Sequence, residues 1–177
     1  MKKFLTIALI AIFCSLGAQA KGRYDDDGGK TALGAKFIYA SRADQLGVGL
    51  DFQLNLTRNI RLAPELQYLF RTDGISTFDL GCNLQYVSTL FDDLAFYPLL
   101  GVSYQRWSRK IPYVEDPRQD VTANVNKIAC NVGLGVEYAF TRHIYGAFEL
   151  RGQFTGKDEL NIDRSQCVIL VGLKYRF

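Results

Sequence analysis

Apolar and polar residues alternate along most of the chain after residue 30. The clearest case is the segment 45–57, in which every second residue from Leu46 to Leu56 is apolar. The residues between them are glycine or polar, as in Gly47 and Asp51. Because neighbouring side chains of a strand point to opposite faces, this pattern predicts a strand with one apolar face and one polar face.

Seven further segments follow the same pattern. The expected strands are 31–41, 45–57, 60–71, 77–90, 94–109, 127–141, 144–155 and 167–177. Each is long enough for the roughly 9–11 residues that a tilted strand needs to cross a bilayer. In a membrane every backbone amide must find a partner, so we expect the strands to close on themselves. The predicted fold is all-β, an eight-stranded antiparallel up-and-down transmembrane β-barrel.

The links between these segments alternate in length. Tight links at 57–59, 91–93 and 141–143 follow the second, fourth and sixth segments, whereas the two long links, 108–126 and 156–165, follow odd ones. Transmembrane barrels have short periplasmic turns and longer outer loops. We therefore expect a periplasmic N-terminus and long loops at the cell surface.

The first twenty residues have the features of a signal peptide. Lys2 and Lys3 precede an apolar stretch, and Ala18-Gln19-Ala20 supplies small residues for cleavage after Ala20. This divides the chain into a signal peptide (1–20), a polar leader (21–30) and a barrel domain (31–177). A retained anchor helix is disfavoured because the apolar run is shorter than the ~20 residues of a membrane span. A lipoprotein at Cys14 is disfavoured because Phe13 occupies the place of a small residue.

The alternation does not by itself say which face points inward. A soluble lipocalin-type barrel, which would be a periplasmic ligand carrier, puts its apolar face inside. Here the apolar face carries no charge between the strand ends, and the polar face is rich in glycine, which suits a crowded lumen. Aromatic residues gather at both strand ends, as in the interfacial girdles of membrane barrels. We therefore expect the apolar face to meet lipid.

The closing segment carries a resemblance to a known family. Alternate residues from Cys167 to Phe177 are apolar, and the chain ends in an aromatic residue. This resembles the last strand of bacterial outer-membrane barrels, in which the C-terminal aromatic is part of the signal read by the barrel-assembly machinery; here that signal would be Tyr175 and Phe177. With the signal peptide and the eight segments, the chain from about residue 31 is similar to the OmpA/OmpX-like, porin-family barrels.

The resemblance implies an integral protein of a Gram-negative outer membrane. The expected partners are outer-membrane lipid, lipopolysaccharide and, during biogenesis, the barrel-assembly machinery. Without the signal peptide the net charge is +1, because residues 1–20 contain two of the 21 Lys and Arg and none of the 18 Asp and Glu. So small a net charge gives no reason to expect nucleic acid as a partner.

The polar face places charges of both signs inside the expected barrel. The predicted lumen network is Lys36, Asp51, Glu65, Asp79, Glu137, Glu149, Arg151 and Lys174. Arg61 and Arg176 are expected nearer the periplasmic end. Buried charges persist when they are paired, which favours a salt-bridged plug. The alternative is a narrow porin-like channel in which rearranged pairs admit ions or small solutes.

The sequence gives no support for an enzyme, a metal site or a cofactor. Its one histidine, His143, falls in a periplasmic turn, away from the outer leaflet where lipid-modifying barrels hold their catalytic groups. No CxxC motif or His/Cys cluster suggests a metal. The remaining candidates are outer-loop contacts with a surface ligand that the sequence does not identify: Trp107, Arg109, Lys110 and Tyr113. We expect a structural or surface-interaction role.

Overall fold

The computed structural model describes residues 31–42, 44–91, 93–111, 121–156 and 165–177. The predicted signal peptide (1–20), the leader (21–30) and Tyr113 lie outside the described residues. Among the described residues, no helix has the length and apolar character that a membrane crossing requires.

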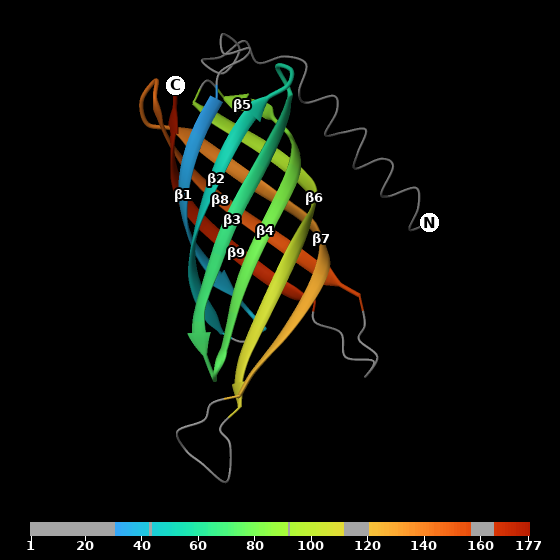
Figure 1. The fold of residues 1–177 in the computed structure, drawn as a ribbon. Helices are drawn as coiled ribbons and strands as arrows, with labels where there is room; N and C mark the ends of the chain where they lie inside the picture. The colour runs from blue at the N-terminus through green and yellow to red at the C-terminus, as the bar shows by residue number, and fades with distance from the viewer. Residues whose placement is uncertain (1–30, 43, 92, 112–120, 157–164) are drawn as a thin grey trace, which may run out of the picture.

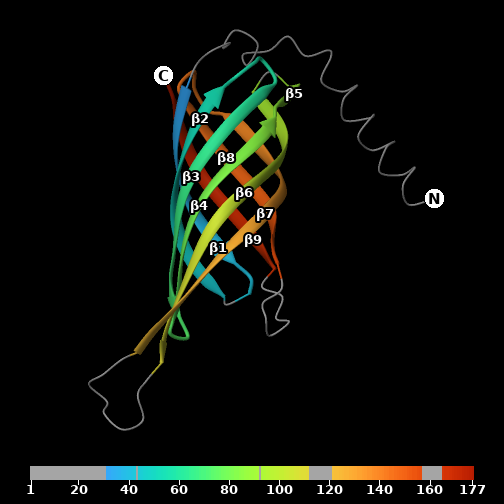
Figure 2. The ribbon, with the colours of Figure 1, turned by 45° about the vertical axis from the view of Figure 1, so that its right-hand side comes forward.

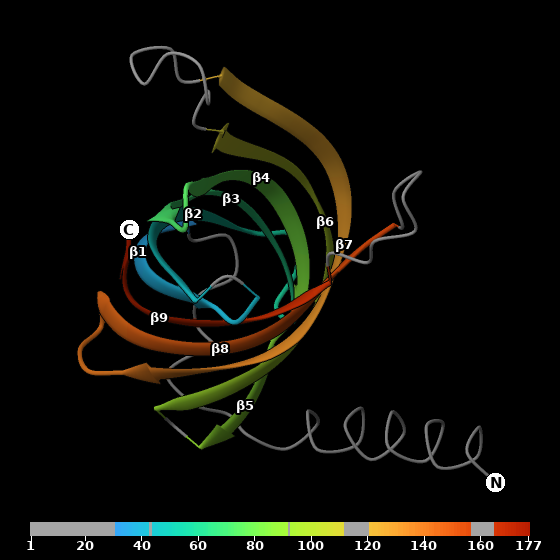
Figure 3. The ribbon, with the colours of Figure 1, turned by 90° about the horizontal axis from the view of Figure 1, so that it is seen from below.

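The described chain is a meander of antiparallel strands that closes on itself (Figures 1 and 3). The strands are β1 Thr31–Ala40, β2 Gln45–Asn55, β3 Ile60–Thr72, β4 Ile75–Tyr86, β5 Ser88–Phe91, β6 Leu94–Ile111, β7 Val121–Ala139, β8 Ile144–Thr155 and β9 Gln166–Arg176. β1 pairs with β9, which closes the ring, and β4 and β5 both pair with β6. The closed eight-stranded antiparallel barrel predicted from the alternation is confirmed.

One predicted strand, 77–90, is divided in two. β4 ends at Tyr86 and the short β5 begins at Ser88. At the break, the Val87 amide donates to the Asn59 carbonyl oxygen (2.7 Å) and Asn59 Nδ2 donates to the Val87 carbonyl oxygen (3.0 Å). These bonds to the β2–β3 turn draw Val87 out of the regular ladder. β4 and β5 therefore act as one interrupted wall strand.

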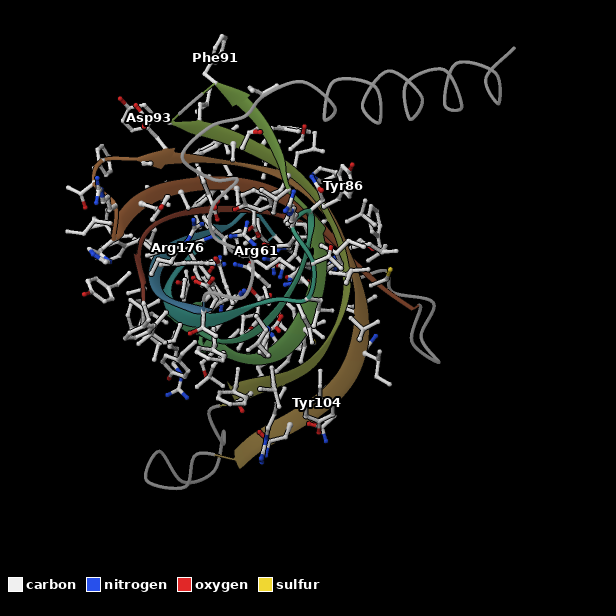
Figure 4. All side chains as sticks on the ribbon, turned by 90° about the horizontal axis from the view of Figure 1, so that it is seen from above. Arg61, Tyr86, Phe91, Asp93, Tyr104 and Arg176 are labelled. Carbon is white, nitrogen blue, oxygen red and sulfur yellow. The ribbon has the colours of Figure 1, made fainter. Side chains whose placement is uncertain are left out.

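Along the barrel wall the apolar side chains are exposed and the polar side chains are buried, which is the opposite of a soluble protein. On β2 the apolar Leu46, Val48 and Leu50 are exposed, whereas Asp51 and Gln53 are buried. Figure 4 shows the same division, with Arg61 and Arg176 directed into the barrel and Tyr104 directed away from it. The apolar face thus forms the outer surface that meets lipid.

The hairpin β6–β7 is longer than predicted. The expected loop 108–126 is strand on both sides, with Ile111 opposite Val121, and only 112–120 fall outside the described residues. β4 reaches only to the position opposite Arg109, and β8 only to the position opposite Ala129. The two strands therefore run past their neighbours, and Figure 2 shows them projecting beyond the barrel.

The sequence did not predict the extended part of β7 because the apolar residues there shift to the other set of alternate positions. In β7 the outward residues from Ile128 onward are apolar, but between 121 and 126 the apolar residues occupy the other set of alternate positions. Beyond the lipid the outward face has no need to be apolar, so the strand continues while the membrane pattern stops.

The face assignment makes a direct prediction about stability. Replacing Leu50, which is 53% exposed on the outer face, with Arg places a charge near the middle of the lipid-facing surface. We expect the free energy of unfolding in lipid vesicles to fall by ~2–4 kcal/mol, against ~0–1 kcal/mol for the control Ile60→Arg near the membrane interface. A Leu50→Arg barrel as stable as the parent would mean that this face does not meet lipid.

Candidate functional site

All eight residues of the predicted lumen network point into the barrel. They are contributed by β1, β2, β3, β4, β7, β8 and β9, and each is at most 5% exposed. Their inward direction follows from the two-residue period of the strands, since each occupies the same set of alternate positions as its buried neighbours. The lumen charges are therefore held in place by the wall itself rather than by loops.

Arg151 is the centre of the first group of charges. Its guanidinium binds Glu149 on its own strand and reaches across the lumen to Glu65 on β3, with Nη2 3.0 Å from Glu65 Oε2. Arginine presents a planar set of donors that can engage two carboxylates at once, which makes it better suited than lysine to this position. Arg151 thereby connects opposite walls of the barrel.

Lys36 lies close to the same group but makes looser contacts. Its Nζ is 3.5 Å from Asp51 Oδ1, 3.6 Å from Glu65 Oε2 and 3.8 Å from Glu149 Oε2. None of these distances is that of a direct hydrogen bond, and Lys36 Nζ is among the buried atoms without one. The ammonium group is shared by three carboxylates rather than committed to one.

Glu137 is the centre of a second group. It pairs with Lys174, and Arg61 Nη1 lies 3.1 Å from Glu137 Oε2. Lys174 Nζ is also 3.9 Å from Asp51 Oδ2, so this contact links the two groups. The sequence reasoning placed Arg61 nearer the periplasmic end and left it out of the network, whereas the structure brings it into direct contact with Glu137.

Tyr97 and Gln53 are lumen residues that the sequence reasoning did not single out. Tyr97 is fully buried, and its hydroxyl donates to Glu149 Oε2 at 3.1 Å. Both Arg61 Cζ and Lys174 Nζ lie 5.2 Å from its ring centroid. Gln53 accepts a 2.5 Å hydrogen bond from Arg61. The alternation of segment 94–109 puts Tyr97 on the same face as Ser103 and Gln105, but that face also carries Leu99, so the pattern is less clear than in the other segments.

A glycine makes room for this tyrosine. A Cβ atom added at Gly135 would collide with the Tyr97 ring. The ring therefore packs directly against the backbone of β7. A side chain at this position would displace Tyr97 and, with it, the hydroxyl that donates to Glu149.

Asp79 stands apart from the paired charges. It accepts hydrogen bonds from Ser103 Oγ (3.3 Å), Gln105 Nε2 (2.9 Å) and Gln153 Nε2 (3.0 Å). Among the described residues, no Lys or Arg side chain makes an ion pair with it. Gln166 extends the cluster by donating to Gln153 at 2.7 Å. The lumen is thus charged in one part and amide-rich in another.

Trp107 belongs to this amide-rich part, and its expected place at the surface is wrong. It is 4% exposed, and its Nε1 donates to Gln105 Oε1 at 3.2 Å. The strand keeps its alternation up to its outer end, so Trp107 falls on the same face as Ser103 and Gln105. A buried indole is not available as an outer contact.

The other outer-loop candidates lie on the projecting hairpin. Arg109 is exposed and lies opposite Ala123, and Lys110 lies opposite Thr122 in the same ladder. Ser108 Oγ donates to Asn124 Oδ1 at 2.7 Å, which joins the two strands through their side chains. The two basic residues therefore stand on paired strands rather than in a loop.

The aromatic residues of the expected assembly signal are on the outer face. Tyr175 and Phe177 are both exposed, with ring centroids 5.3 Å apart in an edge-on arrangement. The ring of His143 stacks on Tyr175 at 5.7 Å, and its Nδ1 is 3.0 Å from the Arg176 carbonyl oxygen. The one histidine therefore contacts the end of β9.

No group of three or more His, Cys, Asp or Glu side chains in the described part of the barrel is arranged to hold a metal ion. Cys82, Cys130 and Cys167 are free thiols, and all three lie among the outward apolar positions of their strands.

Comparisons with known proteins agree with this architecture. The family described as "Outer membrane protein beta-barrel domain" matches residues 6–177. No curated protein matches the chain. Among solved structures, Neisserial surface protein A is 17% identical, with a TM-score of 0.66 over 85% of this chain and 98% of its own.

Two further structures share the fold. A major outer membrane protein from Thermus thermophilus is 12% identical, with a TM-score of 0.67 over 85% of this chain and 100% of its own. Ail, the attachment invasion locus protein of Yersinia pestis, solved with the heparin analogue sucrose octasulfate, is 11% identical, with a TM-score of 0.51 and the same coverage. At these identities the likeness concerns the fold.

The lumen geometry predicts that Arg151 is costly to remove. Arg151→Met would leave Glu65 and Glu149 buried with the longer contacts to Lys36 as their remaining ion pairs among the described residues, and breaking a buried pair in this way costs ~3–5 kcal/mol. We expect that loss in urea unfolding of the barrel in detergent micelles. The matched control is Arg58→Met in the exposed β2–β3 turn, which should change the free energy of unfolding by no more than ~0.5 kcal/mol. Equal, small losses for both variants would contradict the network.

Proposed function

The chain belongs to the outer membrane protein β-barrel domain family and is located in the outer membrane, and from this premise we propose that it is a closed barrel acting at the cell surface. The observation that carries the proposal is the burial of charged side chains inside the barrel. Eight of them, from seven strands, point inward, and each is at most 5% exposed. A small eight-stranded barrel has an interior that side chains can fill.

The surface role rests on the hairpin β6–β7. It is built from paired strands, it projects past its neighbours (Figure 2), and it carries the basic pair Arg109 and Lys110. Binding residues are often presented at the ends of a rigid scaffold. Ail is a protein of this fold whose structure was solved with a heparin analogue. A sulfated polysaccharide is therefore a reasonable first ligand class to test here.

A narrow channel is the second candidate, and Lys36 is the observation that favours it. Its ammonium group is 3.5–3.8 Å from three carboxylates and holds none of them by a direct hydrogen bond. A cation shared in this way could exchange partners and leave room for a file of water. The bidentate contacts of Arg151 oppose such opening because they connect β8 with β3 across the lumen.

We also propose that the protein is not an enzyme. The single histidine contacts the end of β9, and the described residues beside it are Tyr175 and the Arg176 carbonyl oxygen rather than a nucleophile. The exposed pair Tyr175 and Phe177 would act during biogenesis, as the signal read by the barrel-assembly machinery. Lipid and lipopolysaccharide would be the constant partners of the apolar outer face.

Conductance in planar bilayers tests the closed lumen. The parent protein should insert without producing unitary current steps, because Arg151 and Glu65 obstruct the lumen. The double variant Glu65→Ala/Arg151→Ala removes both obstructing side chains and serves as the positive control, with insertion of each protein checked by the mobility of unheated samples on a gel. Reproducible steps from the parent protein would contradict the closed barrel and favour the channel.

Retention on immobilised heparin tests the surface role. The variant Arg109→Ala/Lys110→Ala should reduce retention at least ~tenfold at low salt, since hydrogen bonds to charged groups are each worth ~1.5–3 kcal/mol. Arg142→Ala/Arg58→Ala, which removes two exposed arginines from the opposite end of the barrel, is the matched control. Equal retention of both variants and the parent would argue against the hairpin as a polysaccharide contact.

A further inference from the structure

A long apolar groove crosses the lipid-facing surface. It has a volume of about 1050 Å³ and lies between two rows of outward side chains. One row runs across the strands from Leu94 to Leu66, and the other from Val136 to Phe78. Ala35 interrupts the first row with a small side chain, and the backbone of Gly172 is part of the floor. The groove therefore runs across the strands, parallel to the rows of register partners.

A second, smaller groove lies next to the end of the first. Its volume is about 330 Å³, and its walls include Leu80, Tyr104 and Ile128 on one side and Cys82 and Val102 on the other. Leu80 is the register partner of Leu66 and also of Tyr104. The row of side chains that borders the first groove at Leu66 therefore continues through Leu80 and Tyr104 as a wall of the second groove. The Leu80–Tyr104 part of this row forms a ridge with an apolar groove on each side.

An arginine stands one register row outward of this ridge, in the row of Phe78, which lines the first groove. Arg106 is exposed and points outward, with Phe78 opposite it on β4 and Asn126 opposite it on β7. It lies twelve residues after Leu94 on the same strand. At ~3.3 Å per residue and a strand tilt of ~40°, this separates the two by about 30 Å along the barrel axis. Arg106 therefore lies at the level of the outer headgroups when Leu94 is at the periplasmic interface.

Two further basic residues are exposed at this end of the barrel. Arg71 is at the outer end of β3, which β4 separates from β6, and Arg109 is three residues after Arg106 on the same strand. Among the described residues of this sector, Asp73 in the β3–β4 turn is the one acidic residue beside them. An anionic headgroup would meet a net positive surface directly above two apolar hollows.

We propose that these elements form a binding site for the phosphorylated glycolipid of the outer leaflet, lipopolysaccharide. Its phosphates would be held by Arg106, with Asn126 opposite it on β7 and Arg71 two strands away on β3. Its several acyl chains would occupy the two grooves on either side of the Leu80–Tyr104 ridge. The site lies on the outer face and is independent of the closed lumen and of the hairpin contact proposed above.

Native mass spectrometry of the full barrel in detergent tests the site. The probes are lipid A carrying both phosphates, the same lipid without phosphates, and phosphatidylglycerol. The parent should bind phosphorylated lipid A at least ~tenfold more tightly than either of the other lipids, and Arg106→Ala should remove that preference, because a charge-assisted contact is worth ~1.5–3 kcal/mol. Arg106→Lys should restore part of it, and Arg58→Ala at the opposite end should leave it intact.

A second pair of variants tests the grooves. Val102→Trp fills the smaller hollow and should weaken lipid A binding several-fold, whereas Val132→Trp, an outward residue that lines neither groove, should not. Heat-dependent gel mobility would establish that each barrel is folded. Equal binding of phosphatidylglycerol and lipid A would overturn the proposal, as would a loss caused by Arg58→Ala that matches the loss caused by Arg106→Ala.

Discussion

The structure depends on one constraint: every backbone amide and carbonyl must be hydrogen-bonded within the protein, because the surrounding lipid offers them no partner. A sheet in lipid can meet this requirement only by closing, since an open edge would leave a row of unpaired groups. The ladder between β1 and β9 completes the closure. Closure then fixes the two faces, because a strand has one residue inside for each residue outside. The apolar face meets lipid, and the polar face becomes a core.

Besides burying apolar groups such as Ile38 and Leu170, that inverted core has to satisfy charges. Arg151 does so with two carboxylates, and Glu137 does so with two cations, Lys174 and Arg61. Because the partners come from strands on different sides of the barrel, the ion pairs brace the wall as well as neutralising the lumen. The closed lumen and the surface role that we propose are both consistent with this arrangement of ion pairs.

The sequence predicted the barrel and its two faces in the segments where the lipid requires an apolar side chain at every second residue. The strands and their two faces follow from period two, and the glycine-rich polar face and the aromatic girdles then predicted the inward set that includes Lys36 and Arg151. The sequence could not predict features that depend on contacts between distant residues, which the two-residue period does not specify. The break at Val87 depends on a bond to Asn59 in a distant turn, and the place of Tyr97 depends on the space at Gly135. Beyond the lipid, where the hairpin extension lies, the membrane no longer imposes the pattern.

The fluorescence of Trp107, the chain's one tryptophan, tests the face assignment most directly. In vesicles of lipids brominated near the headgroup, the buried indole should be quenched weakly. A tryptophan at the neighbouring outward position, Arg106→Trp in a Trp107→Phe background, lies at the same level and should be quenched strongly. Strong quenching of Trp107 and weak quenching at position 106 would place the polar face in lipid and contradict the account.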